Sequence, residues 1–138
     1  MRLALAFAAT IAASAALADV KSDLAKIDAA LDKCVKADES NVGMKQCAWS
    51  AYADADKLLN QTYSRLSKDW IGDDEGAAER RKRLVAAQRA WVAFRDAECS
   101  LQATEMLGGS GEGLVQGSCL YGATTERAKA LETLMKPN

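Results

Sequence analysis

Apolar side chains recur every three or four residues along most of the chain, which is the pattern of amphipathic helices. One such stretch covers about residues 21–37, and a longer one runs from about residue 44 to residue 70. A third follows the glycine-bounded acidic turn at 72–76 and ends near Met106. No segment alternates with a period of two residues for long enough to predict a strand. The pattern therefore predicts an all-α domain in which the second and third helices form a long antiparallel hairpin.

A glycine-rich segment separates the third helix from a fourth. Residues 108–117 contain five glycines, and glycine is unfavourable inside a helix, so we expect a loop here. The fourth helix is expected to begin near Thr124 or Thr125, because either hydroxyl can cap it. Its expected core residues are Ala128, Leu131, Leu134 and Met135. The chain is thus expected to be a four-helix domain.

The third helix carries an acidic residue where the pattern places the core. The apolar residues that share one arc, at about 100° per residue, are Leu84, Ala87, Trp91, Phe94 and Leu101. Glu98 falls inside the same arc, which predicts a buried carboxylate. Such a group needs a fixed donor. Arg95, one turn earlier, is the nearest candidate, and Arg127 near the start of the fourth helix is another.

A polar border runs beside the apolar stripe of the second helix. Its members are Tyr52, Asp56, Asn60 and Tyr63. They form either a ledge that faces a ligand or a polar seam between helices. The seam interpretation predicts a hydrogen-bonded structural network that fixes the register of the second and third helices. Its members would be Asn60, Gln88, Arg95, Glu98 and Arg127.

Composition at the N-terminus bears on the location of the protein. Residues 3–17 form an uncharged, alanine-rich apolar run that ends in Ala16-Leu17-Ala18, which predicts a signal peptide over residues 1–18. The run is short for a membrane span, and no cysteine follows the expected cleavage site, so we expect no membrane anchor after cleavage. The remaining residues, 19–138, are expected to form one domain. Loss of Arg2 changes the net charge from −1 to −2, which gives no indication of nucleic-acid binding.

The four cysteines favour a disulfide framework in an exported chain, either periplasmic or secreted. Four cysteines allow three pairings. Cys34 and Cys47 flank the connection between the first two helices, and Cys99 and Cys119 flank the glycine-rich connection. We therefore favour Cys34 with Cys47 and Cys99 with Cys119, as structural staples. The chain has no histidine and no CxxC pair, so we expect no metal and no cofactor.

Catalytic chemistry has little support in the sequence. Without histidine, a Ser-His or Cys-His nucleophile is impossible, and paired thiols are not reactive. The pairs Asp54 with Asp56 and Asp96 with Glu98 are candidates for acid and base. However, neighbours two apart on a helix point in different directions. We therefore expect no catalytic residues and a protein that is not an enzyme.

The basic run Arg80–Arg83 has two interpretations. It could bind an anionic surface, or it could form a solvated helix start beside the acidic turn. Consecutive residues on a helix point around its axis, which favours the solvated helix start.

Several motifs resemble those of the LprI-type lysozyme-inhibitor domain family. They are Met44-x-x-Cys47-Ala48, Tyr52-x-x-Ala55-Asp56-x-x-Leu59-Asn60-x-x-Tyr63, Ala87-Gln88-Arg89-Ala90-Trp91-x-x-Phe94-Arg95-Asp96-Ala97-Glu98-Cys99, Gly108-Gly109-Ser110, and Cys119 followed by Thr125-x-Arg127. The resemblance covers most of residues 34–131. It implies an exported, disulfide-bonded helical domain that inhibits lysozyme.

An inhibitor of a basic enzyme with a cleft would use an acidic surface and a small loop. The candidate partner-contact loop, tethered by the second cysteine pair, comprises Gly108, Gly109, Ser110 and Glu112. Two alternatives stay open. In the first, the loop is only a flexible connection. In the second, the protein is an envelope interaction or structural module with an exported protein or the cell wall as its partner.

Overall fold

The computed structural model describes residues 19–135, except for the side chain of Trp70. It has four helices, α1 (Val20–Ala37), α2 (Asn41–Arg65), α3 (Ala77–Ala103) and α4 (Glu112–Met135). A π-helical turn at Leu66–Trp70 extends α2, and a 3-10 turn at Thr104–Met106 extends α3. No strand occurs among these residues, so the expected all-α, four-helix fold is confirmed. The expected signal peptide lies outside the described residues.

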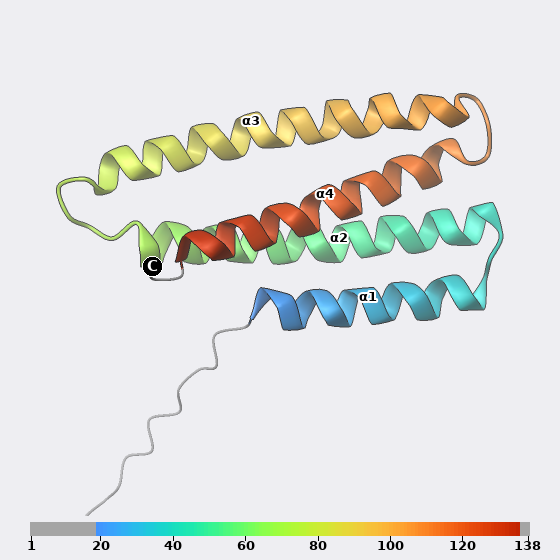
Figure 1. Ribbon diagram of the computed structural model, residues 1–138, viewed down its shortest axis with the longest axis horizontal. Helices are drawn as coiled ribbons and strands as arrows, with labels where there is room; N and C mark the ends of the chain where they lie inside the picture. The colour runs from blue at the N-terminus through green and yellow to red at the C-terminus, as the bar shows by residue number, and fades with distance from the viewer. Residues whose placement is uncertain (1–18, 136–138) are drawn as a thin grey trace, which may run out of the picture.

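The order of the helices in space differs from their order in the chain. Figure 1 shows α1, α2, α4 and α3 side by side, with α4 between α2 and α3. The helices α2 and α3 run antiparallel as expected, but α4 packs along α2 and against α3. The helices α2 and α4 run in the same direction and form the main contact of the fold.

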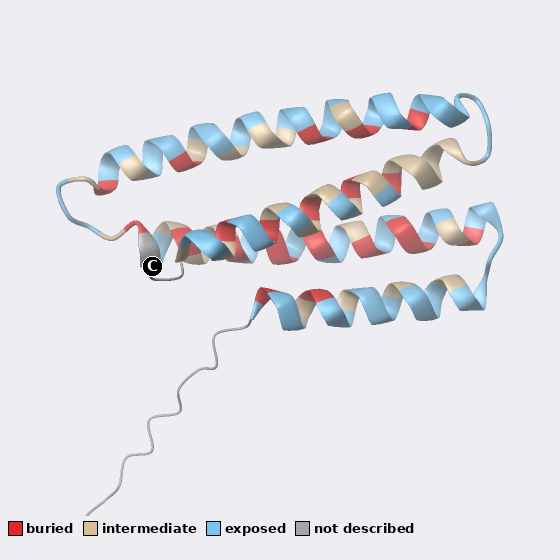
Figure 2. Cartoon of the chain, viewed as in Figure 1, coloured by how far each residue is buried: buried red, intermediate tan, exposed pale blue. Residues whose placement is uncertain are grey.

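The core lies where α2 and α4 meet, and Figure 2 shows the buried residues concentrated on these two helices. The core cluster consists of Val20, Leu24, Leu58, Leu59, Leu66, Ile71, Ala77, Leu84, Ala128 and Leu131. In contrast, α1 and α3 bury only a narrow strip and expose most of their surface. The outer helices therefore depend on a few specific contacts.

Both predicted disulfides, Cys34–Cys47 and Cys99–Cys119, are present. The first fastens the end of α1, a helix that buries only Val20 and Leu24. The start of α1 is held by the backbone amide of Val20, which donates to the Glu132 carboxylate of α4 at 3.0 Å. A short buried face, one disulfide bond, and the hydrogen bonds of Val20 with Glu132 and of Tyr121 with Asp28 therefore hold α1 in place.

The predicted start of α4 was wrong. This helix begins at Glu112 and not near Thr124, so two of the five glycines of residues 108–117 are helical. A Cβ atom at Gly117 would lie 2.9 Å from the indole ring of Trp49, so α2 and α4 can approach closely only without a side chain there. Within α4, Leu134 is 47% exposed, whereas the sequence pattern places it in the core.

The predicted core face of α3 is only partly correct. Leu84 is buried and Trp91 packs against the core, but Phe94 and Leu101 are 64% and 65% exposed. Ala87 is also exposed. The reason is that α3 lies at the edge of the helix layer, with α4 on only one side (Figure 1).

Candidate partner-binding surface

The buried charge of the domain is the guanidinium of Arg95, which is only 6% exposed. It hydrogen-bonds with Asp96 at 2.8 Å on its own helix and with Asp56 of α2 at 3.3 Å. It also donates to the Thr124 hydroxyl of α4 at 3.3 Å. One side chain therefore joins three helices.

Aromatic rings complete the environment of this guanidinium. Its central carbon lies 5.3 Å from the ring centroid of Tyr52 and 5.0 Å from that of Trp91, both within the range of cation–π attraction. Burial alone would lower the pKa of Arg95, but its bond with Asp96 and the nearby charges outweigh burial and raise that pKa. Burial also raises the pKa of Tyr52, although the charge of Arg95 opposes the rise. Arg95 is thus held as a permanent cation.

The prediction that Glu98 is the buried charge and pairs with Arg95 is wrong. Glu98 is half-buried and accepts a hydrogen bond at 3.0 Å from Gln102, one turn later on α3. The carboxylates on Arg95 are those of Asp96 and Asp56. Asp96 and Asp56 keep contact with water while they bond to Arg95, which is covered by two rings. Neither carboxylate therefore has to be fully desolvated, as a buried Glu98 would be.

The five residues of the expected network fall into separate groups. Asn60 donates to Asp56 at 3.1 Å and is thereby connected with Arg95. Arg127 donates to Gln88 at 3.0 Å and lies 5.6 Å from the Trp91 centroid, and burial lowers its pKa. Glu98 joins neither group.

The polar border of α2 is mostly turned toward other helices. Asp56 and Tyr52 surround Arg95, and Tyr63 packs against the core cluster. Asn60 is exposed, but its side chain is bonded to Asp56. These contacts favour a polar seam over a ligand ledge.

The candidate partner-contact loop is shorter and more ordered than the sequence indicated. Gly108 adopts a φ of 72°, which favours glycine, and its amide donates to Glu112 at 2.9 Å. The Ser110 hydroxyl accepts from Asn41 of α2 at 3.0 Å. The polar side chains expected to contact a partner therefore fix the loop, together with the Cys99–Cys119 bond.

The tip of this loop is apolar. Leu107 is 75% exposed and Met106 is 51% exposed, and Val42 at the start of α2 is 57% exposed. Sequence reasoning missed these residues, because glycines and polar groups dominate the pattern of this segment. The signal was present in the adjacent pair Met106-Leu107, which directly precedes the glycines.

The segment around the loop carries only negatively charged side chains. From Asp96 to Glu126 the sequence has five acidic residues and no lysine or arginine. We call the end of α3, the loop and the start of α4, residues 98–112, the acidic end. Lys45 of α2 lies beside Gly113 at its border. The acidic end thus combines carboxylates with an exposed leucine.

The basic run lies at the other end of α3. Arg80 bonds to the carbonyl of Ile71 and to Asp74 at 2.6 Å each, and Arg83 pairs with Glu79 at 2.8 Å. These contacts favour the solvated helix start over a continuous anion-binding run.

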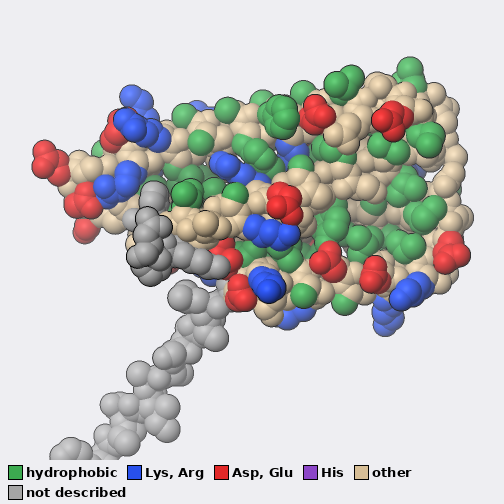
Figure 3. Space-filling view, viewed as in Figure 1, with side chains coloured by type: hydrophobic (Ala, Val, Ile, Leu, Met, Phe, Trp, Pro, Cys, Tyr) green, Lys and Arg blue, Asp and Glu red, His purple; other side chains and the backbone are tan. Residues whose placement is uncertain are grey.

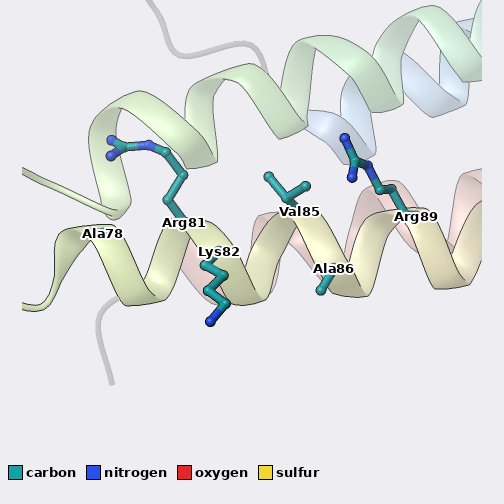
Figure 4. A pocket seen from close by; sticks show the side chains of 6 residues that line it. All are labelled: Ala78, Arg81, Lys82, Val85, Ala86 and Arg89. Carbon is teal, nitrogen blue, oxygen red and sulfur yellow. The ribbon is translucent and has the colours of Figure 1, made fainter.

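A shallow groove of about 490 Å³ lies along the same part of α3. Figure 4 shows Arg81, Val85 and Arg89 on one side of the helix, with Lys82 on the next. Among the described residues, Arg81, Lys82 and Arg89 have no ion-pair partner. The two ends of α3 therefore differ in charge.

The carboxylates of the two candidate acid–base pairs have separate contacts. Asp56 and Asp96 both bond to Arg95, Asp54 is exposed, and Glu98 accepts from Gln102. Within residues 19–135 no group of acidic or cysteine residues is arranged to hold a metal ion. In the same part of the chain, no helix combines the length and apolarity needed to cross a membrane.

Comparison with known proteins finds a match to a family described as lysozyme inhibitor LprI over residues 32–131. An uncharacterized protein of Rhizobium meliloti (strain 1021) is 36% identical over 104 residues. The aligned region covers 70% of this chain and 75% of that protein. No solved structure matches.

Proposed function

Because the chain belongs to the LprI lysozyme-inhibitor family, we propose that it is an exported protein that binds and inhibits a lysozyme. Its two disulfides fit a location outside the cytoplasm, either periplasmic or secreted, where lysozymes act on the cell wall. We assign the contact to the acidic end of the domain. The observation that carries this assignment is the exposed leucine of a tethered loop within an acidic stretch.

Charge supports this assignment. Lysozymes are commonly basic proteins that cleave glycan with two carboxyl groups in a cleft. The carboxylates of Glu98, Glu105 and Glu112 would attract such a target and orient it. The opposite end of α3, with Arg80–Arg83, would repel it. A bound complex would therefore place the acidic end toward the lysozyme.

The loop is built so that little order has to be gained on binding. The Cys99–Cys119 bond holds its two helices together, and hydrogen bonds from Gly108 and Asn41 fix its course. A preorganised loop loses little conformational entropy when it docks. Leu107 at its tip would fill an apolar subsite of the cleft and exclude substrate without any chemical step.

A cell-wall lysis assay with the oxidised protein and lysozymes of several classes tests the proposal. We expect dose-dependent, saturable inhibition. Leu107→Ser should weaken it about ten- to hundred-fold, because burial of a leucine contributes roughly 1.5–3 kcal/mol. Leu134→Ser is the matched control, since Leu134 is an exposed leucine at the far end of α4. It should leave inhibition unchanged.

Equal inhibition by Leu107→Ser and the unmodified protein would move the contact away from the loop. Absence of inhibition for every lysozyme class would refute the proposed function. The alternative, an envelope interaction module without catalysis, would then be the better description. Hydrolysis of wall fragments by the protein alone would contradict both descriptions.

A further inference from the structure

The outer face of α3 is apolar and has no partner within the described domain. At alternating spacings of three and four residues it presents Ala87, Ala90, Phe94, Ala97 and Leu101, all of them exposed. We call these five residues the α3 seam. Such spacing is typical of a helix that packs along a second helix. Phe94 and Leu101, at 64% and 65% exposure, are large apolar groups left in water.

The charges beside the seam change sign along the helix. Its start carries Arg80–Arg83 and Arg89, and its end carries Asp96, Glu98 and Glu105. Figure 3 shows Lys and Arg mixed with acidic side chains near the start of α3, Asp and Glu toward its end, and hydrophobic side chains between them. A helix with this distribution is complementary to a copy of itself that runs in the opposite direction.

We propose that a second copy of this chain docks on the α3 seam, with the two α3 helices antiparallel. A two-fold axis near Phe94 then brings the basic start of each helix to the acidic end of the other. A parallel arrangement would place like charges together and is disfavoured. The same patch serves both copies, which closes the assembly at two chains.

The sizes of the seam residues fit this arrangement. In the register that alternates large and small side chains, Phe94 packs beside Ala97 of the second copy and Leu101 beside Ala90. The alanines allow the helices to approach to about 8–10 Å. A hollow of about 280 Å³ lies beside Phe94 on the side of the seam that faces α4, lined in part by Trp91 and Glu98.

The same register brings Arg83 within about one turn of Glu105 of the second copy. Arg83 is 79% exposed and bonded only to Glu79 of its own helix, so its guanidinium can reach a second carboxylate. One helix pair forms an interface at the small end of the specific range, so we expect a dissociation constant of roughly micromolar size.

Sedimentation equilibrium of the oxidised protein over a range of concentrations tests the proposal. We expect a reversible monomer–dimer equilibrium. Ala90→Arg places a bulky cation in the seam and should raise the dissociation constant at least about ten-fold, which is 1.4 kcal/mol. Ala29→Arg, at an exposed alanine of α1, is the matched control and should change nothing. Helical circular dichroism should be the same for both variants.

Charge reversal tests the antiparallel orientation. Arg83→Glu and Glu105→Arg should each weaken the dimer, and the double variant should restore it. A protein that stays monomeric up to about 1 mM would overturn the proposal, since that concentration is about a thousand-fold above the expected dissociation constant. Dimerisation of Ala90→Arg equal to that of the unmodified protein, or a double variant weaker than both single variants, would also overturn it. Sedimentation is measured without any lysozyme, so a failure of dimerisation and a failure of inhibition are distinguished, although Leu101 and Glu105 also belong to the acidic end.

Discussion

The indole of Trp49 lies directly against the backbone of Gly117, so that a methyl group there would come within 2.9 Å of two ring atoms. The same indole donates to the carbonyl oxygen of Gly113 at 2.9 Å. One ring of α2 therefore rests on two glycines of α4. This contact sets how closely the two central helices pack near the loop.

Gly117→Ala should destabilise the domain by about 1–3 kcal/mol, because the ring must shift and its hydrogen bond is strained. Gly122→Ala is the matched control, since Gly122 lies in the same helix with nothing within 4 Å of its Cβ position. It should stabilise the domain by up to about 1 kcal/mol, through better helix propensity. Urea unfolding followed by circular dichroism measures both. Changes of the same sign would contradict the close-contact explanation.

Arg95→Met should cost about 2–4 kcal/mol of unfolding free energy, because it removes ion pairs and a hydrogen bond that connect three helices. Arg83→Met removes an exposed pair with Glu79 and should cost less than about 1 kcal/mol. Thermal unfolding of the two variants measures both losses of stability. Similar losses of stability would mean that the Arg95 contacts contribute no more than a surface pair.

Replacement of Cys34 and Cys47 by alanine should release the end of α1 and lower stability by about 2–4 kcal/mol. Hydrogen exchange should then become fast in α1 beyond Leu24, because that part of the helix has no fully buried side chain. Replacement of Cys99 and Cys119 should leave exchange in α1 unchanged. Retained protection throughout α1 in the first variant would contradict the role of the disulfide.

The pKa of Asp74 should lie below its usual value of 3.8, because Arg80 and then the amide of Gly76 donate hydrogen bonds to its carboxylate. A depressed folded pKa contributes stability that is present above the unfolded pKa and is lost as the pH falls through the folded one. NMR titration measures this pKa directly. Arg80→Gln should raise it, and Arg81→Gln should not. An unchanged value in Arg80→Gln would refute the assigned cause.

The sequence predicted the helices, the acidic turn and both disulfides, because apolar spacing and cysteine positions are local signals. It misplaced the start of α4 because a glycine that permits close helix packing looks the same as a loop glycine. Gly117 is of the first kind and Gly108 of the second. The positive φ of Gly108 and the position of Trp49 against Gly117 distinguish them, and both are properties of the folded chain.

The sequence predicted the candidate surface less well than the fold, because exposure on α3 depends on which helix lies beside it. A helical wheel shows that Phe94 and Leu101 share a face with Trp91, but it cannot show where the neighbouring helix ends. Because α4 covers one side of α3, Trp91 is sheltered and Phe94 is not. For the same reason the wheel pointed to Glu98 as the buried charge when Arg95 is the one covered.

The dominance of the contact between α2 and α4 has a consequence for how the protein is made. These helices are separated in the chain by the whole of α3, so the main contact of the fold joins segments that are far apart in the sequence. Nearly the entire chain must leave the ribosome before α2 and α4 can pack together. Until then the apolar face of α2 lacks its main partner in the fold.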